Sequence, residues 1–266
     1  MKCTILNVVL VGVAMVLICS PTDAMDTVEM DEEVSDTSLI VKIIGHGAPV
    51  LPVGFTTSAI VCADVVMILD ISCSISRPAK QRVRNIAAAV AQSLLTLINP
   101  EDPSSFSQAR VGVLTYSEDT RHVLYLNHTK PSKQAVKIIK NVKIVKNKET
   151  LCRTATHRAL RDVRNYFFNT RQQNNKQVIH LYTDGLTFLR RNRKALYREQ
   201  KKLKDMGVII NVIAVPQRIG KFEEEEYTTL PHTQQHLYNS TEPNIANQLI
   251  DGLINDASCE DIAKTS

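Results

Sequence analysis

The sequence contains no tryptophan, and aromatic residues make up only 5% of its 266 residues. A core for this chain must therefore be built mainly from Val, Ile, Leu and Ala. Beyond the first two dozen residues there is no apolar run that approaches the roughly 20 residues needed to span a bilayer. We therefore expect no membrane span in the rest of the chain. No internal repeat is apparent.

Recognisable catalytic motifs are also missing. The chain has no Gly-x-Ser-x-Gly, no His-Glu-x-x-His and no phosphate-binding glycine loop. We interpret His157 and His180 as packing or surface histidines, since nothing nearby in the sequence supplies a paired general base. The prediction is that this protein is not an enzyme.

The first residues have the layout of a secretory signal peptide. Lys2 provides a positive start, and residues 5–19 are almost entirely apolar. Residues 20–24 interrupt the apolar run and end with the small residue Ala24, where cleavage is expected. An uncleaved membrane anchor is the alternative, but the apolar run is short for one. We expect residues 1–24 to be removed as a signal peptide and the mature protein to be secreted.

The segment that follows differs in composition from the rest of the chain. Residues 26–36 contain six acids and no base, which is typical of a solvated tail. Residues 37–61 are more apolar but are interrupted by glycine and proline, and we interpret residues 25–61 as an N-terminal extension and linker. The folded domain is expected to cover residues 62–259, followed by a short tail at residues 260–266.

Within that domain, continuous apolar runs alternate with segments that have apolar residues every three to four positions. The runs predict strands, and the periodic segments predict helices. The expected strands are residues 63–69, 110–116, 122–126, 178–182 and 208–215. The expected helices are residues 82–98, 131–142, 156–168, 193–206 and 245–254. This alternation indicates an α/β fold with a doubly wound, mostly parallel central sheet and helices on both faces.

Polar residues gather where the expected strands end. The first strand runs into residues 70–74, Asp-Ile-Ser-Cys-Ser, and the fourth into residues 183–185, Thr-Asp-Gly; residues 153–156, Arg-Thr-Ala-Thr, precede a helix between them. Ligands of parallel sheets bind at the carboxyl ends of the strands, so these three loops should converge. An all-oxygen set suits a hard cation such as Mg²⁺, with Ca²⁺ or Mn²⁺ as alternatives. Taken alone, Asp-x-Ser-x-Ser can also be a turn or a helix cap.

These residues resemble the metal-ion-dependent adhesion site of von Willebrand factor type A domains. The matching positions are Asp70, Ser72, Ser74, Thr154 and Asp184. Residues 63–70 and 110–117 look like the first two strands of that family, and residues 154–160 are similar to its Thr-Asn-Thr-Gly-Lys-Ala-Leu segment. The resemblance covers residues 62–259 and implies one antiparallel edge strand in the sheet.

The resemblance also implies a role for each residue of the site. Ser72, Ser74 and Thr154 would bind the ion directly, whereas Asp70 and Asp184 would act mostly through water. A carboxylate of a partner would then complete the octahedron. Thr156 is expected to cap or open the following helix.

The chain departs from the family pattern in two places. Cys152 and Arg153 replace the glycines usual before the metal-loop threonine, and Cys73 lies inside the metal motif. The loop should therefore be less free to move, and Arg153 could either weaken metal binding or assist an anionic partner.

Four cysteines remain after removal of the signal peptide, an even number that argues for two disulfides in an oxidising compartment. Three pairings are open from the sequence alone. Cys73 and Cys152 lie in loops that approach each other if both hold one ion, and Cys62 and Cys259 flank the domain. We expect the pairs Cys62–Cys259 and Cys73–Cys152, with a bond to another chain as the alternative.

Two other surface features follow from the sequence. Asn127 and Asn239 begin Asn-x-Ser/Thr sequons and are predicted glycosylation sites. Two segments, residues 130–148 and 190–204, are strongly basic, and the second contains one acid, Glu199. Solvated helix faces explain such segments adequately, but outside the cell they also suit a sulfated glycosaminoglycan or another acidic polyanion. No aromatic-interleaved motif points to nucleic acid.

The predicted function is that of a secreted extracellular-matrix or adhesion protein. Its site would use Mg²⁺ to bind a macromolecular partner, a matrix protein or a collagen-like chain. The alternative is a structural matrix protein that binds polyanions through its basic surface without metal.

Overall fold

The computed structural model describes residues 61–96, 108–144, 153–169, 175–188, 190–218 and 224–259. All of them belong to one compact unit of the chain, residues 40–266. The predicted signal peptide, acidic extension and linker, and the tail at residues 260–266, lie outside the described residues. No helix within the described part of the chain is both long enough and apolar enough to cross a membrane.

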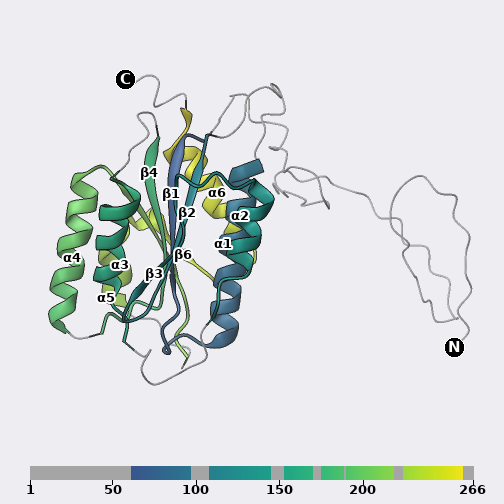
Figure 1. The fold of residues 1–266 in the computed structure, drawn as a ribbon. Helices are drawn as coiled ribbons and strands as arrows, with labels where there is room; N and C mark the ends of the chain where they lie inside the picture. The colour runs from purple at the N-terminus through teal and green to yellow at the C-terminus, as the bar shows by residue number, and fades with distance from the viewer. Residues whose placement is uncertain are drawn as a thin grey trace, which may run out of the picture. The chain divides into compact units, whose positions relative to one another are not determined.

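The centre of the fold is a six-stranded sheet in the order β3-β2-β1-β4-β5-β6 (Figure 1). Its strands are β1 Ala63–Asp70, β2 Arg110–Tyr116, β3 Thr120–Leu124, β4 Lys176–Thr183, β5 Ile209–Ala214 and β6 Leu237–Asn239. Every neighbouring pair is parallel except β2 and β3, which are antiparallel. The mostly parallel sheet with one antiparallel edge strand is therefore confirmed.

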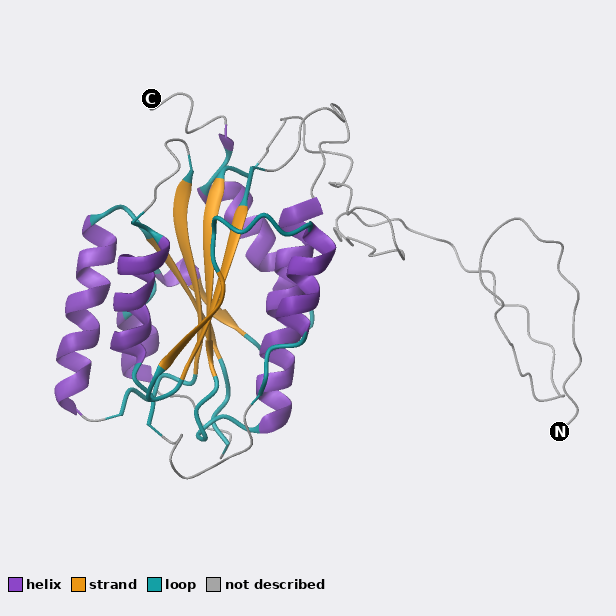
Figure 2. Ribbon diagram, in the orientation of Figure 1, coloured by secondary structure: helices purple, strands orange, loops and turns teal. Residues whose placement is uncertain are grey.

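Helices cover both faces of this sheet (Figure 2). One layer contains α1 Arg77–Thr96, α2 Ser132–Lys140 and α6 Ile245–Asp256, and the other contains α3 Thr156–Asp162, α4 Arg190–Asp205 and α5 Glu224–Thr229. A π-helical turn, Val163–Phe167, continues α3, and a 3-10 turn, Gln234–His236, precedes β6.

The sheet divides the core into two apolar clusters. All of β1 is buried, and its side chains alternate between the clusters because successive residues of a strand point to opposite faces. Val65 and Met67 pack with α1, α2 and α6, whereas Val66 and Ile68 pack with α3 and α4. Burial on both faces explains why β1 is a continuous apolar run.

Several boundaries differ from the expectation. α1 begins at Arg77 rather than at residue 82, because the hydroxyl of Ser76 accepts a hydrogen bond from the backbone N–H of Ala79 and starts the helix earlier. β3 begins at Thr120 rather than at residue 122, since a tight turn follows β2, in which the N–H of Ser117 donates to the carbonyl of Asp119 at 3.1 Å. α5 and β6 were not predicted, because both are short and α5 is largely polar.

The two ends of the domain are joined covalently. A disulfide links Cys62 to Cys259, one of the two expected pairs. Beside it, the N–H of Cys62 donates to the carbonyl of Ala257 at 2.9 Å, and Val61 forms an antiparallel bridge with Ser258. Cys73 is also disulfide-bonded. Its expected partner, Cys152, lies outside the described residues.

Candidate metal site

The first loop of the site continues directly from β1. Asp70 ends the strand and is 2% exposed, and the N–H of Ile71 donates to the carbonyl of Tyr116 at 2.9 Å, which extends the pairing with β2. The N–H of Ser72 donates to Oδ1 of Asp70 at 2.8 Å. Oδ2 of Asp70 is buried and has no hydrogen-bond partner among the described residues. One carboxylate oxygen of Asp70 thus accepts a hydrogen bond that holds the loop, and the other accepts none from the described residues.

The hydroxyls of this loop have the spacing of neighbouring metal ligands. The hydroxyls of Ser72 and Ser74 are hydrogen-bonded to each other, with their oxygens 2.9 Å apart. Magnesium binds oxygen at about 2.0–2.1 Å in an octahedron, which places adjacent ligand oxygens roughly 2.9 Å apart. The two serines therefore fit adjacent corners of a magnesium site.

The second loop follows β4 and places Asp184 beside the first. The turn is possible because Gly185 has φ of 75°, a left-handed conformation that glycine adopts at little cost. The N–H of Leu186 donates to Oδ1 of Asp184 at 3.2 Å, while Oδ2 is buried without a partner among the described residues. As in Asp70, one carboxylate oxygen accepts a backbone hydrogen bond within its own loop, and the other has no hydrogen-bond partner among the described residues.

Burial raises the pKa values of both aspartates. For Asp70 the charge of Asp184 adds to the effect of burial. For Asp184 the effect of burial is opposed by a hydrogen bond from Ser74 and, more weakly, by the charge of Lys80. Two carboxylates so close together in the interior repel each other unless a positive charge compensates them.

The third loop, before α3, is attached through its backbone to the second loop and to the turn between β2 and β3. Thr154 is 2% exposed; its carbonyl accepts from the N–H of Phe188 at 2.9 Å, and the N–H of Ala155 donates to the carbonyl of Ser117 at 2.7 Å. The structure thus brings Asp70, Ser72, Ser74 and Asp184 into one cluster and Thr154 to the same edge.

Thr156 opens α3, as expected. Ala155 occupies the N-cap position, and no side chain caps the helix. The hydroxyl of Thr156 instead lies 3.0 Å from that of Thr187 and 3.4 Å from that of Tyr116. These contacts connect the start of α3 to β2 and to the loop that carries Asp184.

Lys80 is a buried cation beside the site that the sequence analysis missed. It lies on α1 and is 3% exposed. Burial lowers the pKa of its ammonium group, and the charges of Asp70 and Asp184 reverse only part of that effect. A signal was present in the sequence, because residue 80 begins the apolar stripe of the helix that continues through Val83 and Ala87.

Glu226 is a second buried charge that was missed. It lies on α5, is fully buried, and accepts hydrogen bonds at 3.1 Å from both the N–H and the hydroxyl of Thr187. Burial raises its pKa to about 7 despite these bonds and the nearby Arg193, whose Nε lies 3.7 Å away. Nothing in the run of glutamates at residues 223–226 distinguishes this one from its neighbours.

Arg153, the replacement noted in the sequence, lies on the outer side of the third loop. Its side chain is 61% exposed, forms an ion pair with Glu118 at 3.1 Å, and lies 5.4 Å over the ring of Phe188. Arg153, Glu118 and Phe188 line a small cavity of about 140 Å³ together with Thr154. Because Glu118 offsets its charge, Arg153 opposes a cation at the site less than an unpaired arginine would.

The donor set as a whole fits a hard cation. The described residues contain no group of three or more His, Cys, Asp or Glu side chains that could hold a metal. Any metal at this edge must therefore use the serine and threonine hydroxyls together with the two aspartates. Such a set favours magnesium, calcium or manganese over softer metals.

The two predicted glycosylation sites differ in exposure. Asn127 is exposed just after β3. Asn239, at the end of β6, is half-buried, and its Oδ1 accepts hydrogen bonds from the N–H and hydroxyl of Thr241. Glycosylation of either residue stays a prediction.

Comparison with known structures identifies similar folds. Proximal thread matrix protein 1 from the mussel byssus superposes with a TM-score of 0.58 at 18% identity, covering 74% of this chain and 48% of that one. Another structure of that protein has a zinc-occupied MIDAS motif. Manganese-loaded TRAP protein of Plasmodium vivax gives 0.55 at 18% identity, covering 74% of each chain. An aerotolerance-related membrane protein of Bacteroides fragilis gives 0.51 at 17% identity, covering 73% of this chain and 98% of that one.

At these identities the similarity concerns the fold, and this chain spans about half of the mussel protein's length. The comparison with curated protein sequences gave no match. The model of the von Willebrand factor type A domain matches residues 64–252, which is most of the chain and includes every residue of the candidate site. The chain therefore belongs to the von Willebrand factor type A domain family.

Proposed function

We propose that this protein is an extracellular adhesion or matrix protein that binds another protein through a divalent cation. Ser72, Ser74 and Thr154 would hold the cation directly, and Asp70 and Asp184 would hold it through water. When bound, a cation at this edge supplies a positive centre for a carboxylate of the partner. Magnesium is the proposed ion, with calcium and manganese as alternatives.

The observation on which this rests is a pair of buried carboxylate oxygens without partners. Oδ2 of Asp70 and Oδ2 of Asp184 accept no hydrogen bond among the described residues, beside two hydroxyls 2.9 Å apart. Burying an uncompensated charge is costly, so a cation bound beside these oxygens would offset that cost. Lys80 compensates part of this charge but carries one positive charge against two carboxylates.

The similar structures support the metal in general terms. Zinc occupies the corresponding motif in one structure of the mussel protein, and the Plasmodium vivax protein is described as manganese-loaded. The extracellular setting is supported by the signal-peptide layout of residues 1–24 and by the Cys62–Cys259 disulfide, which is typical of oxidising compartments. A matrix protein or collagen-like chain is the proposed partner.

Metal binding is tested by titrating the oxidised full-length protein with magnesium, calcium or manganese chloride in a calorimeter. Wild type should bind one ion, and Asp70→Asn and Asp184→Asn should lose binding. Asp119→Asn is the matched control, since Asp119 lies at the same edge but its side chain is 90% exposed. At an ion concentration of about 100 Kd the wild type should gain about 2.7 kcal/mol of stability. Absence of heat and of stabilisation with all three ions would refute the proposal.

Partner binding is tested by a pull-down from extracellular matrix, with and without EDTA. Wild type should retain a protein that Asp70→Ala and EDTA both release, and Asp119→Ala should retain it. We expect no enzymatic activity from the same preparation. A partner retained equally in EDTA would contradict binding through a cation.

A further inference from the structure

The side of α2 that faces solvent carries a row of lysines. We call Lys130, Lys133, Lys137, Lys140 and Lys143 the α2 lysine row. All five are exposed, and spacings of three and four residues place those on the helix along one face. Residues 120–148 contain no aspartate or glutamate, so no acid of the same segment lies between them.

Within the part of the chain that the structure describes, no acid pairs with this row. Among the described residues, none of the five lysines belongs to an ion pair. Unpaired cations in a row produce a positive field that attracts anions.

The other basic segment is different. On α4, Lys201 pairs with Asp205 at 3.0 Å, Lys202 with Glu199 at 2.9 Å, and Arg193 with Glu225 at 2.6 Å. Such pairs add little stability, but each removes a charge from the field that a polyanion would meet. Three bases of the second segment are thus paired with acids, whereas none of the five lysines of the α2 lysine row is paired with an acid of the described residues.

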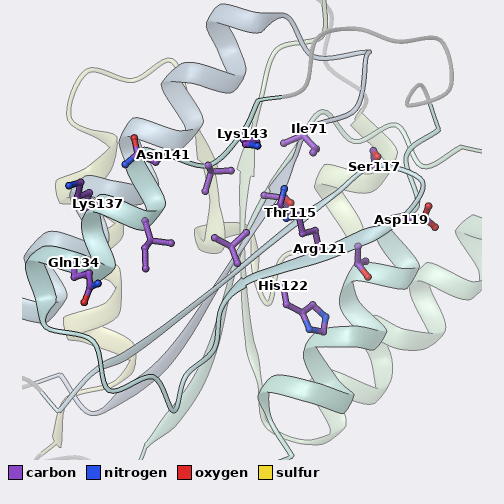
Figure 3. Close-up of a pocket in the computed structure, with 14 residues that line it drawn as sticks. Ile71, Thr115, Ser117, Asp119, Arg121, His122, Gln134, Lys137, Asn141 and Lys143 are labelled. Atoms are coloured by element: carbon purple, nitrogen blue, oxygen red, sulfur yellow. The ribbon is translucent and has the colours of Figure 1, made fainter.

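A groove lies beside the α2 lysine row. It has a volume of about 640 Å³ and runs between α2 and the edge strand β3 (Figure 3). Lys137 and Lys143 line one wall, and Arg121, from β3, lines the other. Asp119 is an acid at this groove, and Arg158 pairs with it at 3.1 Å. Cations from two elements therefore face one hollow.

The chemistry of this surface favours a polysaccharide over a protein partner. The exposed residues of α2 are Lys133, Gln134, Lys137 and Lys140, with no aromatic side chain among them. Protein interfaces are depleted in lysine and enriched in aromatic residues. Lysine is a strongly hydrated point charge, suited to a chain that is bound through its charges rather than its shape.

We propose that the α2 lysine row and Arg121 form a binding site for a sulfated glycosaminoglycan chain that requires no metal. Sulfate groups would pair with the lysines along α2 and with Arg121 across the groove. This localises the polyanion binding considered from the sequence to one surface and assigns no such role to α4. It does not depend on the metal site.

The test measures binding of heparin to the full-length protein in EDTA, so that failure of the metal proposal cannot affect it. A triple variant, Lys137→Gln, Lys140→Gln and Lys143→Gln, is compared with Lys201→Gln, Lys202→Gln and Lys204→Gln on α4, which removes the same charge. The α2 variant should bind heparin about tenfold more weakly, as expected for three exposed ion pairs, and the α4 variant less than about twofold. Arg121→Gln, from the opposite wall, provides an independent variant that should also weaken binding.

Three results would overturn the proposal. Equal weakening by the α2 and α4 variants would show that net charge rather than this site binds heparin. Equal affinity for heparin and desulfated heparin would exclude sulfate recognition, and tighter binding of polyglutamate than of heparin would assign the surface to an acidic peptide. All substituted residues of the α2 variant are exposed, and a thermal unfolding curve checks that the fold is retained.

Discussion

Glu226 and Thr187 join α5 to the loop that carries Asp184. Both the N–H and the hydroxyl of Thr187 lie 3.1 Å from the carboxylate oxygens of Glu226, in a fully buried position. The same hydroxyl lies 3.0 Å from Thr156, the first residue of α3. A single buried carboxyl thus connects two of the three loops that form the site.

This relationship predicts a pH-dependent stability. Burial raises the pKa of Glu226 from 4.5 to about 7, so the folded state holds its proton more tightly than the unfolded chain. The stability contributed by Glu226 is therefore complete below pH 4.5 and is lost as the pH rises to about 7, by an amount on the order of 3 kcal/mol. The free energy of unfolding, measured in urea at pH 5 and at pH 7.5, should differ less between the two pH values for Glu226→Gln than for wild type. Glu225→Gln, at a half-exposed neighbour, is the control, and equal differences in all three proteins would contradict the prediction.

Lys80 should oppose a divalent cation. Its ammonium interacts electrostatically with both Asp70 and Asp184. It therefore already offsets part of the negative charge that a bound metal would offset. Replacing it by methionine, which keeps most of the volume, should increase magnesium affinity by roughly tenfold. The same variant should be less stable than wild type in EDTA, because two carboxylates then remain uncompensated.

Calorimetry and urea unfolding in EDTA measure the two effects of Lys80→Met. Lys133→Met removes an exposed lysine and should change neither. A weaker affinity for magnesium in Lys80→Met would show that Lys80 supports the metal site instead of competing with the ion.

The disulfide between Cys62 and Cys259 should be a major source of stability. It closes a loop with a sequence separation of 197 residues, and long loops lose the most entropy on closure in the unfolded chain. Replacing both cysteines by serine should lower the free energy of unfolding by about 2–5 kcal/mol. Because the bond lies at the opposite end of β1 from Asp70, magnesium affinity of the folded variant should be unchanged. Calorimetry at low temperature and urea unfolding test both statements, and an unchanged unfolding midpoint would contradict the first.

A side chain at Gly112 should destabilise the fold. A Cβ at this position in β2 would lie 2.8 Å from Cδ1 of Phe167, which is 1% exposed in the π-helical turn. Gly112→Ala should therefore destabilise the fold by about 1–3 kcal/mol through overpacking. The double variant Gly112→Ala with Phe167→Leu should recover part of this loss. Thermal unfolding that is unaffected by the single substitution would show that the ring moves away at no cost.

Much of the fold could be predicted because its signals are local. The run from Ala63 to Leu69 and the apolar periodicity of residues 82–98 predicted β1 and most of α1. The alternating Asp-x-Ser-x-Ser pattern placed Asp70, Ser72 and Ser74 in one loop, and the topology rule placed Asp184 at the same edge. α5 and β6 could not be predicted in this way, since β6 is three residues long and depends on pairing with β5.

The sequence by itself determined the order of strands and helices and the types of oxygen ligand available, because periodicity and short motifs are properties of neighbouring residues. Only the tertiary structure decided which charges are compensated. Arg193 finds Glu225 thirty-two residues away, whereas the α2 lysine row finds no acid among the described residues. Lys80 and Glu226 become neighbours of the candidate site for the same reason: burial and long-range contact depend on which segments the fold brings together.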